Sequence, residues 1–379
     1  MLVEIPVSIY RGGTSKGLFI DEANLPVEED ARNLILLKLM GSPDTRQING
    51  LGGAVSTTSK VAIISKEEKN AWDVNYTFAQ VSVDKPVVSY SGNCGNISSA
   101  VGIYAIENQL VEITSPMTKV AVYNTNTKKV INEYIPTPNG QLTYEGDFEI
   151  SGVPGKGLKI ELEFLDPSGA FSGKLLPTGR LKDEIDLENG NRVTVSIVDA
   201  ANPLVYLKAE DLDLQGIETP EEIDSNVPLL SLLEEIRGKA AVLMGIIDDY
   251  KDSAVITPGV PKMTLIASPI DYQTTGGVSI AANDYDLSVR MMSMQKAHKS
   301  IALTGALCTG AASYIEGTLV HDLLKNKNQD KALEIGHSSG KITVSTLAQK
   351  QDNKQEIQSV SSYRTARKLM TGTAYIEEA

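Results

Sequence analysis

Residues 3–20 read VEIPVSIYRGGTSKGLFI, and this stretch decides the fold. Its first part, residues 3–9, alternates apolar and other side chains at a period of two, which predicts a strand with one buried face. A glycine-rich loop over residues 11–17 follows, and residues 18–20 are apolar enough for a second short strand. The chain is therefore expected to open with a strand, a glycine loop and another strand.

Turn and cap signals predict the elements that follow. A helical pattern covers residues 28–40, and the turn signal Gly41-Ser42-Pro43 ends it. Residues 55–64 are rich in β-branched side chains, which predicts a strand with Lys60 inside it. Lys60 is thus a charged side chain in an otherwise apolar or small-residue segment.

A second glycine-flanked turn holds the first of two cysteines. Residues 85–90 predict a strand, residues 91–96 read SGNCGN, and residues 97–107 are small enough for a closely packed helix. Cys94 is therefore expected where a strand becomes a helix.

An internal repeat at an offset of 188 residues organises the chain. Residues 195–197 repeat the Val-Ser-Ile of residues 7–9, and each is followed by a polar turn, an apolar strand and an acidic segment. A small-residue stretch beginning at Ala302 is a counterpart of the cysteine turn and its helix. Two matches in the same order indicate a duplicated domain. We place domains at residues 1–180 and 181–379, and leave open a return of the last residues to the first domain.

Composition and charge exclude several classes of protein. The chain has 379 residues, of which 41% are apolar and 22% charged, as in ordinary globular proteins. Its formal charge of −13 argues against nucleic-acid binding, which depends on Lys and Arg. The N-terminus lacks the signature of a signal peptide, and no apolar run is long enough to span a bilayer. We expect a cytoplasmic protein with no membrane or nucleic-acid partner.

Cysteine and histidine usage bears on metals and disulfides. The two cysteines, Cys94 and Cys308, lie 214 positions apart, which argues against a disulfide framework or a thiolate zinc site. The histidines His298, His321 and His337 are too scattered for a recognisable metal motif. We therefore expect reduced thiols and no metal.

Cys94 is the first candidate catalytic residue. Flanking glycines allow close approach of the backbone, and the following helix offers unpaired N–H groups and a positive dipole end, which favour a thiolate. The same helix start is a candidate site for a substrate carboxylate, with Asn93, Gly95 and Asn96 as ligands. The alternative is a small buried residue at a tight turn.

The first glycine loop provides further candidate ligands. Thr14, Ser15 and Lys16 are expected to donate hydrogen bonds to the substrate, although such a loop often only turns the chain. Leu18 stands where a Walker loop would continue with Lys and then Ser or Thr, so a nucleoside triphosphate is not implied.

Lys60 is the second candidate catalytic residue. A lysine at a strand edge is usually solvated, and that interpretation stays open. Two catalytic roles also stay open, namely a proton donor that stabilises charge, or a base after desolvation.

The second half contributes four further candidate ligands. His298 lies shortly before the second helix start, where Thr304 and Gly305 follow. Ser338 belongs to the turn at residues 336–340, which either binds an anion or closes a hairpin. In a duplicated fold the two helix starts are expected to face one another across a central cleft.

Several of these motifs resemble the PrpF family of 2-methylaconitate cis-trans isomerases, whose relatives include 3-methylitaconate Δ-isomerase and 4-oxalomesaconate tautomerase. The resemblance rests on residues 11–17, on Gly52-Gly53 with Ser59-Lys60-Val61, and on residues 91–96. It extends over nearly the whole chain, including residues 291–294 and 336–340.

The resemblance implies an α/β (α+β) fold of the diaminopimelate-epimerase-like kind, with two pseudo-symmetric domains whose strands wrap a central helix. It also implies a site between the domains, no organic cofactor or metal, and a proton shift that moves or rotates a double bond in a small polycarboxylate. The family's lysine and cysteine map onto Lys60 and Cys94, and its first-loop serine onto Ser15. A homodimer and a place in propionate catabolism are further expectations.

The chain departs from the racemases of this fold in one respect. Those enzymes use two opposed cysteines, whereas the second helix start here offers Ala302 or Leu303, and Cys308 lies further inside the helix. A two-thiol racemase is thus disfavoured, and the departure suits a 1,3-proton shift shared by Lys60 and Cys94. A related tautomerase or Δ-isomerase, and a carboxylate-binding protein without turnover, stay open as alternatives.

Overall fold

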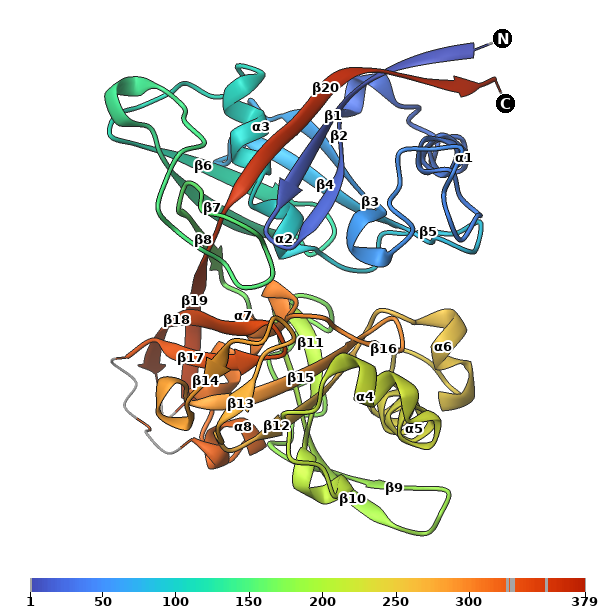
Figure 1. Cartoon of the computed structure of the whole chain (residues 1–379), viewed down its shortest axis with the longest axis vertical. Coiled ribbons are helices and arrows are strands. Elements are labelled where there is room, and N and C mark those ends of the chain that lie inside the picture. Colours follow the sequence, from blue (N-terminus) through green and yellow to red (C-terminus); the bar gives the residue numbers. More distant parts are fainter. Residues whose placement is uncertain (1, 325–326, 328–330, 352–353, 379) are drawn as a thin grey trace. The chain divides into compact units, whose positions relative to one another are not determined.

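The computed structural model describes residues 2–324, 327, 331–351 and 354–378. The chain forms two compact units, the first of Met1–Glu163 with Tyr363–Ala379, and the second of Phe164–Ser362 (Figure 1). The sequence placed the division at residue 180 and left open whether the last residues return to the first domain. Strands β8 (Ile160–Leu165) and β19 (Lys354–Arg364) run across the division between the units.

The first unit is built on a mixed sheet with the order β20-β1-β2-β3-β4-β6-β7. The β2–β3 and β4–β6 pairs are parallel and the others antiparallel, and β5 adds an antiparallel pair to β4. The strands are β1 (Leu2–Gly12), β2 (Ser15–Asp21), β3 (Lys60–Lys66), β4 (Val74–Val81), β5 (Val88–Ser89), β6 (Met117–Asn124), β7 (Lys129–Pro136) and β20 (Ala366–Glu377).

The second unit repeats this pairing pattern. Its order is β9-β10-β11-β12-β15-β17-β18, with parallel pairs again at β11–β12 and β15–β17, and β16 pairs with β15 as β5 pairs with β4. Strand β19 then pairs with β18. The strands are β9 (Asp183–Asp186), β10 (Arg192–Ala200), β11 (Asn202–Lys208), β12 (Lys262–Ala267), β15 (Leu287–Ser293), β16 (Lys296–Ala297), β17 (Leu333–His337) and β18 (Gly340–Gln351), with a separate hairpin of β13 (Tyr272–Gln273) and β14 (Ser279–Ile280). The same order and sense in both units agree with the repeat that the Val-Ser-Ile match predicts.

Each sheet is covered by helices. In the first unit α1 (Glu29–Met40) packs Leu36 and Leu39 against Val7 and Leu18, and α2 (Gly95–Ser98) and α3 (Val101–Glu107) are also buried. In the second unit α5 (Val227–Leu243) packs against β10, β11 and β12, and all of α7 (Leu303–Ser313) is buried. The remaining helices are α4 (Pro220–Ser225), α6 (Ser253–Ile256) and α8 (Leu319–Leu323). No helix among the described residues is long and apolar enough to cross a membrane.

Local structure confirms some expected boundaries and corrects others. Helix α1 ends at Gly41, whose φ of 77° gives a left-handed cap, as the turn signal predicts. The strand predicted over residues 55–64 is wrong in its first half, because Ser56–Thr58 forms a 3₁₀ turn and β3 begins at Lys60. Thr58 Oγ1 donates to the carbonyl of Val55 at 3.1 Å, and such local bonds compete with strand pairing. Lys60 is thus the first residue of the strand rather than an interior one.

The helix predicted over residues 97–107 is two short helices, α2 and α3. Ser98 Oγ donates to the carbonyl of Cys94 at 3.1 Å, and Ser99 Oγ donates to the carbonyl of Asn96 at 2.7 Å. The Cys94 carbonyl also accepts from the backbone N–H of Ser98 at 2.9 Å, whereas the backbone N–H of Ala100 bonds to the carbonyl of Ile97 at 3.1 Å instead of that of Asn96. The Ser99 hydroxyl thus competes with the helical backbone where the first helix ends. The helix dipole behind Cys94 is therefore short, and the unpaired N–H groups of the first turn are the larger electrostatic effect.

Candidate active site

In the first unit the β1–β2 hairpin lies directly against α2. A Cβ atom on Gly12 would lie 2.4 Å from the carbonyl oxygen of Asn96, and one on Gly13 would lie 2.3 Å from Asn96 Oδ1. Gly13 also has a φ of 51°, which disfavours other residues. The glycines of the first loop are thus required by close packing against the turn that carries Cys94.

Asn96 connects the hairpin to the strand end at Arg364. Its Nδ2 donates to Thr14 Oγ1 at 3.1 Å, and its Oδ1 accepts from Arg364 Nε at 2.9 Å. The side chain is only 3% exposed. Asn96 was expected to contact the substrate, but both polar atoms of its side chain are engaged within the unit, so we infer that it positions the loop.

Cys94 caps the start of α2 and is partly exposed. Its Sγ lies 3.9 Å from the hydroxyl of Ser15, the first residue of β2. The neighbouring Asn93 accepts a hydrogen bond of 3.4 Å from Asn124 Nδ2, which ties the turn to β6. The structure therefore brings together Cys94 and Ser15, although the sequence separates them by 79 positions.

Lys60 is positioned from two sides by the sheet. Its backbone pairs with Gly17 of β2 and with Gln80 of β4, and its side chain is 8% exposed. The Nζ atom donates to Gln80 Oε1 at 2.5 Å and lies 5.1 Å from the centre of the Phe78 ring. Lys60 is thus a buried amine rather than a solvated strand-edge lysine.

Gln80 is held so that its oxygen faces that amine. Its Nε2 donates to the backbone carbonyls of Ser56 and Ser59 at 3.1 and 2.9 Å. An amide whose nitrogen is bound to two carbonyls presents its oxygen in the opposite direction. Gln80 has no local signature in the sequence, because its contact with Lys60 is set by strand register.

The start of β2 therefore has candidate catalytic groups around it. Ser15 contacts Cys94, and Gly17 pairs with Lys60. A Cβ atom on Gly17 would lie 2.7 Å from the carbonyl oxygen of Lys60, so this glycine also permits the close packing. Lys16, between them, is partly exposed.

A buried acid lies in the sheet and helix layers of the same unit. Glu133 of β7 has no exposed surface, and its Oε2 accepts from the backbone N–H of Gly102 at 2.9 Å. Burial raises the pKa of this carboxyl well above its usual range. Burial also raises the pKa of Tyr76, with the Cys94 thiol as the next largest cause. Glu133 Oε1 and the Tyr76 hydroxyl have no hydrogen-bond partner among the described residues.

In the second unit the segment at His298 lies against the turn at residues 336–340. His298 Nδ1 accepts from the backbone N–H of Ser300 at 3.0 Å, and Ser300 Oγ lies 3.4 Å from His337 Nδ1. Ser339 Oγ also donates to the carbonyl of Lys299. With Nδ1 accepting, a neutral His298 carries its proton on Nε2. Ser338 is buried in this turn, at 4% exposure.

The start of α7 is closely packed. Ala302 is its cap, Thr304 is buried, and a Cβ atom on Gly305 would lie 2.1 Å from Met291 Cε. Gly305 is therefore needed for packing against Met291. Cys308 is fully buried, and burial raises the pKa of its thiol to about 12.

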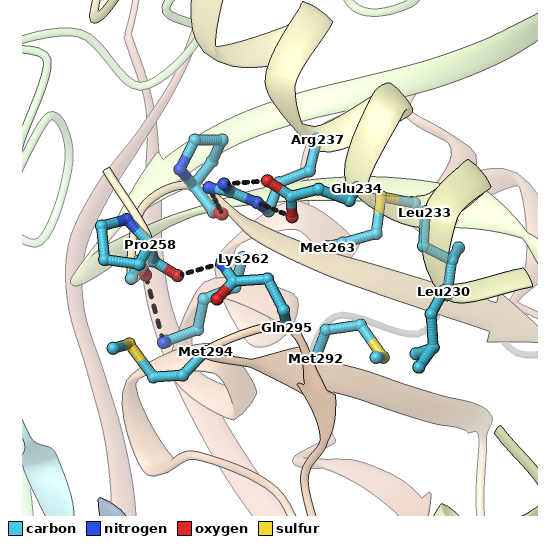
Figure 2. A pocket seen from close by; sticks show the side chains of 12 residues that line it. Leu230, Leu233, Glu234, Arg237, Pro258, Lys262, Met263, Met292, Met294 and Gln295 are labelled. Atoms are coloured by element: carbon cyan, nitrogen blue, oxygen red, sulfur yellow. Dashed lines mark hydrogen bonds and ion pairs between the residues drawn. The ribbon is translucent and has the colours of Figure 1, made fainter. Parts of the chain in front are cut away.

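The small cavity beside Arg237 in the second unit does not qualify as a substrate site. A cavity of about 10 Å³ lies beside Arg237 and Glu234, which form an ion pair with Nη2 and Oε1 2.6 Å apart. Figure 2 shows the side chains that line this cavity. Such a cavity has room for one water molecule at most. Met292 and Met294 from the motif at residues 291–294 line it.

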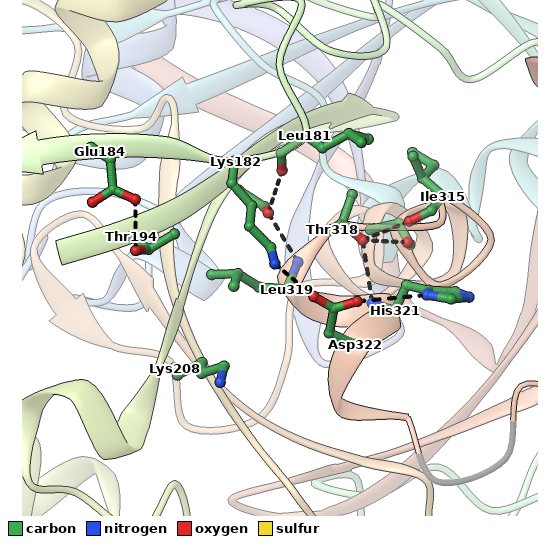
Figure 3. Close-up of polar contacts among 12 residues, drawn as sticks. Leu181, Lys182, Glu184, Thr194, Lys208, Ile315, Thr318, Leu319, His321 and Asp322 are labelled. Atoms are coloured by element: carbon green, nitrogen blue, oxygen red, sulfur yellow. Dashed lines mark hydrogen bonds and ion pairs between the residues drawn. The ribbon is translucent and has the colours of Figure 1, made fainter.

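The contacts around His321 are structural. Thr318 Oγ1 accepts from the backbone N–H of His321 at 3.2 Å, and Asp322 pairs with Lys182 at 2.7 Å (Figure 3). Burial lowers the pKa of the imidazole. Among the described residues, no group of three or more His, Cys, Asp or Glu side chains is arranged to bind a metal ion.

The chain is similar in sequence to known proteins over almost its whole length. A family model described as PrpF protein matches residues 2–377. The chain is 41% identical over 378 residues to a 3-methylitaconate isomerase of Eubacterium barkeri, covering 100% of this chain and 98% of the relative. It is 36% identical over 383 residues to a 2-methyl-aconitate isomerase of Shewanella oneidensis, covering 98% and 96%.

Solved structures with a similar fold include a relative of the same kind. The crystal structure of methylitaconate-delta-isomerase has a TM-score of 0.82 and 41% identity, covering 99% of this chain and 96% of that one. A hydroxyproline epimerase from Agrobacterium vitis has a TM-score of 0.58 and 11% identity, covering 99% and 93%, and this likeness concerns the fold alone. Together they confirm the predicted α/β fold of the diaminopimelate-epimerase-like kind. The chain therefore belongs to the PrpF family.

Proposed function

We propose that the protein isomerises a small unsaturated di- or tricarboxylate, with 2-methylaconitate as the leading candidate, by a proton shift that needs no cofactor. The isomerase class follows from membership of the PrpF family and from its curated relatives. One observation supports the catalytic residues most strongly. Cys94 and Lys60, 34 positions apart in the sequence, both adjoin the first residues of β2, one through Ser15 and one through Gly17.

The proposed chemistry begins with removal of a proton from a carbon next to the double bond. The electrons of the broken C–H bond delocalise through the double bond into a carboxylate, forming a dienolate. Rotation within this intermediate, or return of the proton at another carbon, gives the isomer. Cys94 and Lys60 divide removal and return. The two groups then restore their starting protonation by exchange with water, so solvent hydrogen enters the product.

Stabilisation of the dienolate is assigned to polar groups that donate hydrogen bonds. The N–H groups at the start of α2, the Ser15 hydroxyl and the exposed part of Lys16 are proposed donors in the first unit. His298, Thr304, Gly305 and Ser338 are further proposed substrate ligands. The Asn96 side chain acts indirectly in this scheme, through Thr14 and Arg364.

A panel of unsaturated acids tests the proposal and its nearest rivals. Purified protein is incubated with 2-methylaconitate, 3-methylitaconate and 4-oxalomesaconate, and the products are identified by NMR. Conversion of one acid assigns the substrate and supports the isomerase. If no acid is converted but one of them protects Cys94 from alkylation, a binding protein without turnover replaces the proposal.

A further inference from the structure

Strand β20 is an edge strand of the sheet in the first unit. It runs antiparallel beside β1 (Figure 1) and, among the described residues, pairs with no other strand. Eight of its 12 residues are exposed. An edge strand presents unpaired N–H and C=O groups on its open side, where a strand of another chain can add to the sheet.

The middle of this edge lacks the charges that usually keep other strands away. Residues 369–376 read LMTGTAYI, with no charged residue and no proline. Leu369 is 50% exposed, Met370 36% and Tyr375 61%. Exposed apolar side chains on an uncharged edge indicate a surface that another strand covers.

The two ends of β20 carry opposite charges, which indicates the kind of strand that fits. Arg367 and Lys368 lie at its start, whereas Glu377 and the following Glu378 lie at its end. In an antiparallel pair of identical strands, the start of each strand lies beside the end of the other. A second copy of this chain therefore brings acids to the basic end, and opposite charges across a strand pair are stabilising.

Arg367 has a like charge as its neighbour within the chain. It lies directly across from Arg11 of β1. No carboxylate among the described residues forms an ion pair with Arg367, whereas Lys368 pairs with Glu107 at 2.9 Å. Like charges across a strand pair are destabilising. An acid on the open side of β20 would offset this repulsion.

We propose that β20 pairs antiparallel with β20 of a second copy of this chain, forming a dimer with its two-fold axis at Thr373. The same surface is used on both copies, as a two-fold contact requires. The sheets of the two first units join into one, so neither copy keeps an open edge at β20. This dimer concerns assembly and does not depend on the proposed reaction.

A bulge shifts the register of β20 by one residue. Met370 lies across from Ile9 of β1 and Lys368 lies across from Tyr10, so Leu369 has no partner on β1. The same residue is expected to stay out of the pairing with the second copy, because a bulge adds an extra residue to its own strand. The pairs on the two sides of Leu369 are therefore counted separately.

The charges then select the position of the axis. With the axis at Thr373, Lys368 lies across from Glu377 of the second copy. The next pair along the strands is Arg367 and Glu378. An axis one residue earlier places both cations across from uncharged residues.

Sedimentation velocity tests whether this edge holds two copies together. We expect the native protein to contain at least two chains per particle and Thr373→Lys to halve the particle mass, because two lysines would face one another on the axis. Met117→Lys is the matched control, since Met117 is 43% exposed on another strand of the same unit. It should keep the native mass. A native protein that is a monomer, or a Thr373→Lys variant of native mass, would overturn the proposal.

A charge exchange tests the pairing of the two ends. Arg367→Glu should raise the dissociation constant of the dimer by about tenfold, because like charges then meet at both symmetric ends. The double variant of Arg367→Glu with Glu378→Arg exchanges the charges within each pair and should restore the native value. No recovery in the double variant would contradict this pairing.

Cysteine cross-linking tests the position of the axis. Thr373→Cys places two thiols directly across from one another, at a Cα separation that a disulfide can span, and should give a covalent dimer on mild oxidation. Gly372→Cys is the comparison, because its thiol would lie across from Ala374, and the native protein with Cys94 and Cys308 gives the background. Cross-linking of Gly372→Cys in preference to Thr373→Cys would overturn the assigned axis.

Discussion

The amine of Lys60 lies 2.5 Å from the amide oxygen of Gln80, and the Gln80 nitrogen is fixed by the carbonyls of Ser56 and Ser59. Because the Gln80 amide is fixed, it also fixes the position of the Lys60 amine. Gln80→Leu removes the bond while keeping most of the side-chain volume. We expect kcat/KM to fall by between about tenfold and about a hundredfold, because a small misplacement of a catalytic group has effects of that size. Steady-state kinetics on the converted acid measures the effect.

Gln141→Leu serves as the comparison for Gln80→Leu, since Gln141 is exposed in the same unit. It should retain native kinetics. Native activity in Gln80→Leu would show that Lys60 does not depend on this contact.

The two cysteines should differ sharply in reactivity. Cys308 is fully buried and its Sγ donates to the carbonyl of Val198 at 3.4 Å, whereas Cys94 is partly exposed. Because burial raises the pKa of Cys308 to about 12, iodoacetamide should modify Cys94 in the folded protein and spare Cys308. Cys308→Ala should retain activity. Loss of turnover in that variant, with the fold intact by circular dichroism, would revive a two-thiol mechanism.

The buried carboxyl of Glu133 should cause the free energy of unfolding to fall as the pH rises. The unfolded chain ionises this carboxyl near its usual pKa, whereas the folded protein keeps it protonated because burial raises its pKa. Its contribution to stability is therefore fully present below the unfolded pKa and is lost as pH rises toward the folded pKa. In Glu133→Gln that loss is absent. Urea unfolding at about pH 5 and about pH 8 should show the variant gaining stability over the native protein at the higher pH; a difference independent of pH would contradict the assignment.

The hairpin should not tolerate a side chain at Gly12. A Cβ atom there would lie 2.4 Å from the carbonyl oxygen of Asn96 and 3.1 Å from Ile97 Cα, and backbone atoms cannot move aside easily. We expect Gly12→Ala to lower the free energy of unfolding by about 1–3 kcal/mol. Gly276→Ala is the control, because its Cβ atom would lie 3.8 Å from Thr274 Oγ1, an ordinary contact. Equal stability of the two variants would mean that the hairpin is not tightly packed on α2.

Local patterns in the sequence predicted much of the fold. The period-two alternation before the glycine loop and the cap at Gly41 depend only on neighbouring residues. The repeat at residues 195–197 predicted that the second unit contains an equivalent of the first hairpin. The break between α2 and α3 could not be predicted, because Ser99 acts through a side-chain hydrogen bond that apolar periodicity does not register.

The candidate site was predictable only in part. Cys94, Ser15 and Lys60 stand in recognisable motifs, so they were found. Gln80 meets Lys60 through the register of two strands, and Arg364 meets Asn96 across most of the chain. Contacts of this kind are set by tertiary structure. A buried arginine near the end of a sequence carries no local sign of its partner.

In the proposed reaction Cys94 and Lys60 shift a proton within an unsaturated polycarboxylate. Proton NMR of 2-methylaconitate in deuterated buffer tests it most directly, with the native protein, Cys94→Ser and Lys60→Ala measured side by side. We expect isomerisation with deuterium uptake by the native protein and its loss in both variants. Isomerisation that persists in both variants, or isomerisation without deuterium uptake, would contradict it.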